Sequence, residues 1–586
     1  MSNILIKTVR INGFRGLKNI EVKLEQTTVL TGMNNAGKTS FLKALQIVFG
    51  NRHFITQDDF FIENGTSVEK IIIDILIVPI DTEEQEINGF SDGWETLFGT
   101  SRIKYNEEKP FIPLRTIITF DPIRTLYTTQ QYILDNWSNF QNGDEHWYSI
   151  DNGNKKSFKF EEMPFFYMDA QRDILDDLKS KSSYLGKMLS KIEYSTDALV
   201  AIEEQIRALN ETAVTDSPIL SDIRETLKDL DSTIGSNNEN IEITPFTKKV
   251  RDLNKGLTIY YGNEQDSFPM EHHGMGTRSW SSLLTLKAFI KLLESSSHDN
   301  PFFPILAIEE PESHLHPNAQ KKLYSQINSM SGQKIISTHS PYIASASNIF
   351  EIRNFYKNEV VECGKINIEN LDSESIRKIE RQVINTRGEI FFSKCLVLFE
   401  GETEEQALPL LFEKYFSTTS IELGVDFIGV GGFGNYLPFI RFAEDFKIPW
   451  IIISDNDQAG EIKTSVQKQL ITSLTTKEET EVVIFLDDTR DFERQLIDDG
   501  FQDEIKQVFI SLLEYNNEQH RIATEETKQQ EINTYTDNQL YEKMTSIKTK
   551  FAPLIAHEIY LSEKELPTKV ISLFEKIRTI LQIEGD

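Results

Sequence analysis

A glycine-rich segment near the N-terminus constrains the fold of this chain more than any other feature. Residues 32–39, GMNNAGKT, match the pattern GxxxxGK[ST] after the strand-like run IEVKLEQTTVL, and a helical pattern follows from Thr39 to Val48. In such a loop the glycines let backbone N–H groups face phosphate, the lysine reaches the β- and γ-phosphate oxygens, and the threonine binds Mg²⁺. The sequence therefore predicts an α/β sheet with a site for ATP or GTP. The residues expected to line this site are Asn34, Asn35, Ala36, Gly37, Lys38, Thr39 and Ser40.

Two later segments supply the groups that nucleotide hydrolysis requires. In PILAIEEPE an apolar strand, Ile305 to Ile308, delivers Glu309 and Glu310 to its carboxyl end. Glu309 is predicted to hold the Mg²⁺ shell and Glu310 to polarise the attacking water; a solvated acidic turn is the alternative. A further short strand in KIISTHSPY ends at His339, which is predicted to sense the γ-phosphate. A buried structural histidine is the alternative for that position.

A second group of carboxylates lies near the ends of two other predicted strands. Glu400 and Glu404 follow KCLVLF, and Asp455 and Asp457 follow WIIIS. Four acids at neighbouring strand ends repel one another unless divalent cations neutralise them. Because oxygen ligands favour hard cations, the pattern predicts a site for Mg²⁺ or Mn²⁺ formed by these four residues.

Three further residues are weaker candidates for the same site. Glu493 follows a third strand, VVIFL, and is either an additional metal ligand or an exposed helix acid. Lys564 is predicted to stabilise an anionic transition state, with Lys569 as the alternative. The spacing alone does not separate these two lysines.

Composition limits the class of protein. The chain has 586 residues, enough for three or four domains, and its 91 acidic and 61 basic residues give a net charge of −30. That charge argues against general coating of nucleic acid but not against a nucleic-acid enzyme whose metal ions hold one phosphodiester. The two cysteines show no CxxC pairing, and the chain has neither a signal peptide nor 18 consecutive apolar residues. We therefore expect a cytoplasmic protein without a membrane segment.

Helical periodicity dominates from about Gln171 to Arg251. Two apolar faces, separated by the turn-like TAVTDSP, predict an antiparallel helical hairpin that pairs with a second copy or packs on its own domain. The faces comprise Leu199, Ile202, Ile206 and Leu209, and then Leu220, Ile223, Leu227 and Leu230.

These motifs together resemble the ABC-type ATPases of the SMC, Rad50 and RecF kind. The resemblance rests on FRGL at residues 14–17, the phosphate loop, the distant EEPE and the histidine. HHGMGTRSW, which contains Gly274 and Gly276, resembles the signature motif that completes the ATP site of another subunit; a plain turn is the alternative. Gln57 resembles the glutamine of the Q-loop.

The four carboxylates, with VGGFGN between them, resemble the Toprim domain of topoisomerases, primases and several nucleases. An ABC ATPase followed by a Toprim domain is the architecture of the OLD (overcoming lysogenization defect) family, which includes the Gabija-type nuclease subunit. FFYMDAQRDI resembles that family's lead into its dimerisation region. The resemblance implies an ATPase and metal-dependent DNA endonuclease that forms a homodimer or higher oligomer and acts in defence against phage, with a possible accessory component.

The expected fold is α/β, with a helical insertion in the ATPase. The predicted parts are the ATPase in 1–163 and 251–355, the helical dimerisation insertion in 164–250, a linker in 356–390, and the Toprim domain with a helical end in 391–586. Three alternatives stay open: a nuclease acting on RNA such as tRNA, a non-nucleolytic ATP-driven clamp, and topoisomerase or nucleotidyl-transfer chemistry. No tyrosine is marked as the nucleophile that a topoisomerase needs.

Overall fold

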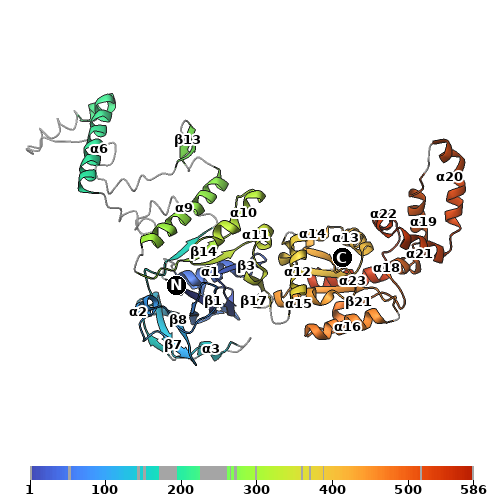
Figure 1. The fold of residues 1–586 in the computed structure, drawn as a ribbon, viewed down its shortest axis with the longest axis horizontal. Coiled ribbons are helices and arrows are strands. Elements are labelled where there is room, and N and C mark those ends of the chain that lie inside the picture. Colours follow the sequence, from blue (N-terminus) through green and yellow to red (C-terminus); the bar gives the residue numbers. More distant parts are fainter. Residues whose placement is uncertain are drawn as a thin grey trace, which may run out of the picture. The chain divides into compact units, whose positions relative to one another are not determined.

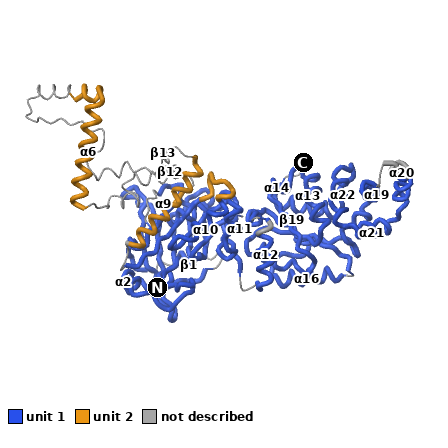
Figure 2. Tube along the Cα trace, turned by 45° about the horizontal axis from the view of Figure 1, so that its top comes forward, with its two compact units in different colours: residues 1–167, 299–310, 320–586 blue, residues 168–298, 311–319 orange. Residues whose placement is uncertain are grey.

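The computed structural model divides the chain into two compact units, each considered by itself (Figure 2). The first comprises Met1–Tyr167, Asp299–Glu310 and Gln320–Asp586, and the second Met168–His298 and Pro311–Ala319. The residues that the structure describes are 3–49, 55–140, 146–149, 153–169, 195–224, 260–263, 266–269, 274–296, 300–357, 360–367, 371–386, 388–458, 460–514 and 518–583. Leu227, Leu230 and residues 170–174 of FFYMDAQRDI lie outside them.

A seven-stranded antiparallel sheet opens the first unit (Figure 1). Its path runs β10 (Gly153–Lys155), β9 (Leu126–Leu134), β8 (Lys109–Asp121), β6 (Lys70–Ile80), β1 (Asn3–Phe14) and β2 (Leu17–Lys23), and β7 (Lys104–Asn106) pairs with β8. The run KIIIDILIVPI, expected as a strand, is β6 and is buried along most of its length. FRGL forms the tight turn between β1 and β2, where Arg15 takes a left-handed φ of 50°.

The phosphate loop belongs to a six-stranded sheet in the same unit. The order is β11 (Phe165–Met168), β14 (Ile305–Glu309), β15 (Gln333–Ser337), β3 (Thr27–Gly32), β16 (Ile352–Lys357) and β17 (Val361–Gly364). The four strands from β14 to β16 pair in parallel, so their carboxyl ends share one edge. Helix α1 (Lys38–Val48) follows β3 and buries Phe41, Leu42 and Leu45 in the core.

The last sheet has four parallel strands in the order β19 (Val425–Gly429), β18 (Cys395–Phe399), β20 (Trp450–Ser454) and β21 (Val483–Phe485). Three of these are the expected strands; β19, from VDFIG, was missed because the run is short and carries an acid. The described helices between and after them are α13 (Glu402–Phe416), α14 (Ser420–Leu423), α15 (Tyr436–Phe446), α16 (Glu461–Ser473), α17 (Glu479–Val482), α18 (Phe492–Asp498), α19 (Gln502–Ser511), α20 (Glu518–Asn533), α21 (Asp537–Ser546), α22 (Lys548–Leu561) and α23 (Thr568–Leu581).

The segment predicted as a linker, 356–390, contains regular structure. Strand β17 extends the six-stranded sheet, and α12 (Ser373–Asn385) follows it. A short 3-10 turn, η6 (Glu389–Phe392), then leads into β18. The domain boundaries given above stay predictions.

The second unit contains the helices α6 (Thr196–Asp216) and α9 (Met275–Ser296) and the hairpin of β12 (Tyr260–Asn263) with β13 (Asp266–Pro269). On α6, Ile206 of the predicted apolar face is buried together with Asn210 and Val214, whereas Leu209 of that face is 60% exposed.

The described helices contain none that is both long enough and apolar enough to span a bilayer.

A buried ion pair joins two central strands of the antiparallel sheet. Arg115 on β8 donates from Nε and Nη2 to the carboxylate oxygens of Asp74 on β6, at 2.8 and 2.7 Å. Both side chains are almost fully buried, and Arg115 also donates to the carbonyl of Trp147 at 2.6 Å. Burial raises the pKa of Asp74, and the hydrogen bond from Arg115 opposes that rise. The buried charge of the Asp74 carboxylate is therefore stabilised by the Arg115 guanidinium.

We expect Arg115→Leu to lower the free energy of unfolding by about 3–5 kcal/mol, because it leaves the Asp74 charge buried without a partner. Urea denaturation followed by circular dichroism measures the change. Arg124→Leu, in the exposed turn between β8 and β9, is the control. Adding Asp74→Leu to Arg115→Leu should restore most of the loss; a double variant as unstable as the single one contradicts the interpretation.

Candidate active sites

Two glycines give the phosphate loop its shape. Gly32 ends β3 with a φ of +122°, and a Cβ there would lie 2.0 Å from the carbonyl oxygen of Phe355. Gly37 has a φ of +99°, and its Cβ would lie 2.9 Å from Cδ2 of Leu17. Neither position admits a side chain, so the sequence pattern follows from backbone geometry as well as from phosphate binding. Between them Asn34 and Asn35 are exposed, and Ala36 is buried.

The side chain of Lys38 folds back onto the phosphate loop. Its Nζ donates to the carbonyl oxygens of Gly32 at 2.7 Å and Met33 at 3.0 Å, and the residue is buried. Thr39 and Ser40 follow in the first turn of α1. The loop and the helix start adjoin as the sequence predicts, and the contact of Lys38 with phosphate stays a prediction.

The carboxyl edge of the sheet brings the expected hydrolytic residues together. Thr39 Oγ1 donates a hydrogen bond to Glu309 at the end of β14, although 270 positions separate the two in sequence. The hydroxyl of Tyr167 donates to the other carboxylate oxygen of Glu309. Sequence reasoning missed Tyr167, because nothing in FFYM marks a tyrosine that faces an acid. The two predicted Mg²⁺ ligands, Thr39 and Glu309, are thus direct neighbours.

Glu310 and His339 form the second pair at this edge. His339 Nε2 lies 3.5 Å from Glu310 Oε1. Burial, followed by the charge of Lys38, lowers the pKa of His339, which favours the neutral imidazole. Glu310 has a left-handed φ of 43°, uncommon for a residue with a side chain, and its N–H donates to the Ser337 carbonyl at 2.9 Å. The acid therefore sits on a constrained backbone rather than in a free turn.

The other predicted nucleotide contacts are Gln57, Gly274 and Gly276. Gln57 is exposed in the 3-10 turn η1 (Gln57–Asp59). Gly274 directly precedes α9, as expected of a signature motif at a helix start. A Cβ on Gly276 would lie 2.6 Å from the carbonyl oxygen of His314, so close packing requires glycine there. Both glycines belong to the second unit, and their role at an ATP site stays a prediction.

The four predicted metal ligands converge at the carboxyl edge of the four-stranded sheet. Glu400 follows β18, Asp455 and Asp457 follow the neighbouring parallel strand β20, and Glu404 lies in the first turn of α13. Ser454 Oγ donates to Glu400 Oε1 at 2.6 Å. Glu404 Oε2 and Asp455 Oδ1 are buried and have no hydrogen-bond partner.

Burial, together with repulsion between neighbouring acids, raises the pKa values in this cluster. Burial, followed by the charges of Glu404 and Glu400, raises the pKa of Asp455 to about 9. Burial likewise raises the pKa of Glu404 to about 7, and the charge of Glu493 adds to it. Burial also raises the pKa of Glu400, against a hydrogen bond from Ser454. The acids are held together at a cost that a cation would remove.

A divalent cation fits these donors. Buried carboxylate oxygens without partners are uncommon in folded proteins, and an all-oxygen set suits Mg²⁺ or Mn²⁺. In the described part of the chain, no three acids, histidines or cysteines yet surround one point as ligands would. The cluster therefore supplies the ligand chemistry without a preformed cage.

Glu493 is not the exposed helix acid that the sequence left open. It is 1% exposed, accepts from Thr403 Oγ1 at 2.5 Å, and pairs with Lys548 Nζ at 3.0 Å. The nearby Asp491 accepts a hydrogen bond from the hydroxyl of Tyr541 at 2.8 Å. Sequence reasoning did not find Lys548, Asp491 or Tyr541. Lys548 and Tyr541 come from helices far along the chain, with no local signal.

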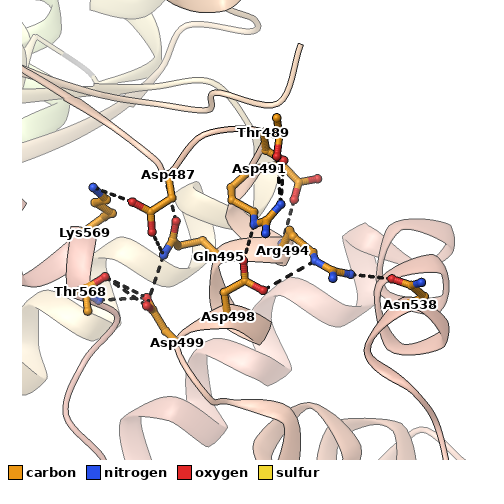
Figure 3. Close-up of polar contacts among 11 residues, drawn as sticks. Asp487, Thr489, Asp491, Arg494, Gln495, Asp498, Asp499, Asn538, Thr568 and Lys569 are labelled. Carbon is orange, nitrogen blue, oxygen red and sulfur yellow. Dashed lines mark hydrogen bonds and ion pairs between the residues drawn. The ribbon is translucent and has the colours of Figure 1, made fainter. Parts of the chain in front are cut away.

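The two predicted lysines contact other groups. Lys564 Nζ donates to the Gly500 carbonyl and to Glu504, both at 2.8 Å. Lys569 Nζ lies 3.0 Å from Asp487, in the loop after β21, beside the contacts of Thr568 with Asp499 (Figure 3). Burial lowers the pKa of Lys548, but the charges of Glu493, Glu404 and Asp455 outweigh it and raise that pKa above its ordinary value, so Lys548 is the lysine beside the carboxylate cluster.

The chain is similar to known proteins over most of its length. Residues 5–344 match the family model described as an AAA ATPase domain, and residues 391–457 match the TOPRIM domain of overcoming lysogenization defect protein-like proteins. The first match covers more than half of the chain.

Three relatives align with both parts. The uncharacterized protein YbjD of Escherichia coli (strain K12) is 22% identical over 501 residues, covering 80% of this chain and 82% of that protein. The OLD nuclease of Thermus scotoductus is 24% identical over 476 residues, covering 77% and 82%. Endonuclease GajA of Bacillus cereus (strain VD045) is 25% identical over 478 residues, covering 78% and 75%.

The raised pKa of Asp455 predicts how the stability of the metal-free protein depends on pH. Aspartate in the unfolded chain titrates near 3.8, so the folded state binds an extra proton between that value and about 9, and stability falls as the pH rises across this window. In chelator, we expect the melting temperature of the wild type to fall between about pH 5 and pH 8 by at least ~3 °C more than that of Asp455→Asn.

Asp503→Asn, at an exposed position on α19, makes the same charge change and serves as the control. Differential scanning calorimetry measures all three proteins. Parallel pH profiles for the wild type and Asp455→Asn would show that the acid cluster is not under the repulsion described here.

Proposed function

This chain belongs to the OLD family, in which an ATPase domain precedes a Toprim domain, and from that premise we propose that it is an ATP-hydrolysing, metal-dependent DNA endonuclease. Its relatives named OLD nuclease and GajA support an enzyme that combines an ATPase with a nuclease. We further propose a two-metal mechanism with Mg²⁺ or Mn²⁺ and a role in defence against phage.

One observation carries the nuclease proposal. Glu404 Oε2 and Asp455 Oδ1 are buried beside other carboxylates and have no hydrogen-bond partner. In a domain with a purely structural role such oxygens would lower stability, because burying each one costs desolvation energy without a compensating contact. A cation site explains both oxygens and the repulsion between the acids.

The residues of this site divide into ligands and supporting groups. Glu400, Glu404, Asp455 and Asp457 would hold the cations, and Glu493 would serve as a further ligand or as their neighbour. Bound metal would supply activation of water and stabilisation of the departing oxygen during phosphodiester cleavage. Ser454 fixes the orientation of Glu400 through its 2.6 Å hydrogen bond.

Lys548 takes the supporting role that the sequence gave to Lys564. Its ammonium lies 3.0 Å from Glu493, whereas the Lys564 ammonium is paired with Glu504. A cation beside the acids offsets part of their charge and is placed to stabilise an anion that develops there.

The ATPase site has its own division of labour. Lys38 would leave the carbonyls of Gly32 and Met33 to clamp the nucleotide phosphates. Thr39 and Glu309 would share the Mg²⁺ ion, and Glu310 would polarise the attacking water. His339, neutral and beside Glu310, would read the γ-phosphate.

We propose a homodimer or higher oligomer that acts on DNA in the cytoplasm, with a possible accessory component. Gly274 and Gly276 would complete the nucleotide site of a second copy at the N-terminus of α9. On the second unit, Val200, Leu209 and Ile223 are large apolar side chains that remain exposed, as a dimerisation surface requires.

Two alternative functions differ in which of the two sites they require. An RNA nuclease would use the same carboxylates on a substrate such as tRNA. A non-nucleolytic clamp would need only the nucleotide site, and the unpaired oxygens of Glu404 and Asp455 argue against it.

We expect Lys38→Ala to abolish ATP hydrolysis, because it removes the phosphate clamp. Glu310→Gln should keep ATP binding while turnover falls by about 100-fold or more, because only the water-polarising carboxylate is lost. Phosphate release and binding of a fluorescent ATP analogue measure the two effects. Lys43→Ala, one turn further along α1, is the matched control, and undiminished hydrolysis by Lys38→Ala would overturn the nucleotide site.

We expect Asp455→Ala, Asp457→Ala and Glu400→Ala each to abolish nucleic-acid cleavage while ATP hydrolysis stays near normal, because they belong to a separate metal centre. Lys548→Met should lower cleavage by about 10–100-fold, whereas Lys564→Met stays within about threefold of the wild type. Supercoiled DNA, linear DNA and tRNA are incubated with each protein and Mg²⁺ or Mn²⁺, with a chelator control.

The substrates separate the rival functions. Cleavage of tRNA alone favours the RNA nuclease, and no cleavage of any substrate by the wild type favours the clamp. Cutting by Asp455→Ala at the wild-type rate under matched metal would rule out this carboxylate site as the nuclease centre.

A further inference from the structure

Asn354 connects the strand of the phosphate loop to a helix of the Toprim part. It lies on β16 in register with Thr31 of β3. Thr31 Oγ1 donates to Asn354 Oδ1 at 3.1 Å, and Asn354 Nδ2 donates to the Phe446 carbonyl at the end of α15, at 2.9 Å. Both hydrogen bonds are buried, so water does not compete for them.

The same end of α15 is held at further points by the hairpin of β16 and β17. A Cβ on Gly364, at the end of β17, would lie 2.5 Å from the carbonyl oxygen of Asp445, so the two backbones touch. The N–H of Asn367 donates to the Asp445 carboxylate at 2.8 Å. This end of α15 is therefore fixed to the ATPase sheet.

The opposite end of α15 reaches the carboxylate cluster. Tyr436, its first residue, is fully buried, and its hydroxyl donates to the Ile453 carbonyl on β20 at 3.4 Å. The next residue on that strand, Ser454, donates to Glu400. An α-helix of 11 residues is about 16 Å long and nearly rigid, so movement at one end is passed to the other.

Nucleotide binding would act on β3, at the end of this chain of contacts that lies farthest from the carboxylates. Thr31 directly precedes Gly32, whose carbonyl accepts a hydrogen bond from Lys38 in the structure. A lysine that turns to a phosphate leaves that carbonyl without this partner. If Lys38 turns to the phosphates as proposed, the end of β3 has different hydrogen bonding with and without nucleotide, which a coupling mechanism requires.

We propose that Asn354 and α15 form the mechanical link through which nucleotide at the phosphate loop alters the position of Glu400 and hence the rate of nucleic-acid cleavage. This inference rests on the proposed function and adds its regulation. Asn354 is a positioning residue, since it touches neither nucleotide nor metal ligand. The alternative is that the hydrogen bonds of Asn354 only stabilise the fold.

The experiment compares cleavage of supercoiled DNA in Mn²⁺ with and without ATP, in the wild type and in Asn354→Leu. The ratio of the two rates reports coupling whichever way ATP acts; couplings between sites are typically about 5–150-fold. We expect the ratio in Asn354→Leu to come within about twofold of one, while ATP hydrolysis and ATP-free cleavage each stay within about threefold of the wild type.

A second variant keeps the test decisive if Asn354→Leu is unstable. Thr31→Val preserves shape and removes only the hydroxyl that bonds Asn354, so we expect a smaller shift of the ratio in the same direction. Asn12→Leu removes a comparable bond, from Asn12 Nδ2 to the Lys18 carbonyl at 2.6 Å, away from α15 and should leave the ratio unchanged. Melting temperatures are measured for all three.

The outcomes separate the two proposals. A wild type that cuts no nucleic acid overturns both the proposed function and this inference. A wild type that cuts, with a ratio of one or with a ratio that neither Asn354→Leu nor Thr31→Val changes, overturns the inference alone. If a variant has a lowered melting temperature but the wild-type ratio of rates, Asn354 only stabilises the fold.

Discussion

Parallel pairing of strands is the constraint on which both sites depend. In the ATPase sheet it places the ends of β14, β15 and β3 at one edge, so that Glu309 and His339 meet Lys38 although hundreds of residues separate them from it. In the Toprim sheet it does the same for Glu400 and Asp455 at the ends of β18 and β20. An antiparallel arrangement would put neighbouring strand ends at opposite edges. The chemistry thus follows from strand direction.

The two sites handle their charge differently. At the nucleotide site, Lys38 and the hydroxyls of Thr39 and Tyr167 satisfy the loop and Glu309 in the absence of ligand. The Toprim edge keeps buried carboxylate oxygens without partners, and Lys548 offsets only part of the charge. The acid at the first site thus has hydrogen-bond donors, whereas the second site keeps buried acids close together with little to offset their charge.

Sequence reasoning succeeded where a residue's position along a strand decides its place in space. Lys38, Glu309 and Asp455 were predictable because each stands at the end of an apolar run beside a recognisable motif. Lys548 was not, because its place beside Glu493 depends on how α22 packs on α13, which no local pattern encodes. The same limit hid the burial of Glu493.

The backbone of Glu310 has a consequence for how this enzyme can change. A residue with a side chain at a φ of 43° is strained by about 1–3 kcal/mol, and glycine would relieve that strain. Glycine would also remove the carboxylate that faces His339. If Glu310 polarises the attacking water as proposed, selection for stability and selection for turnover oppose each other at this one position, and a more heat-resistant descendant would arise here only as a poorer ATPase.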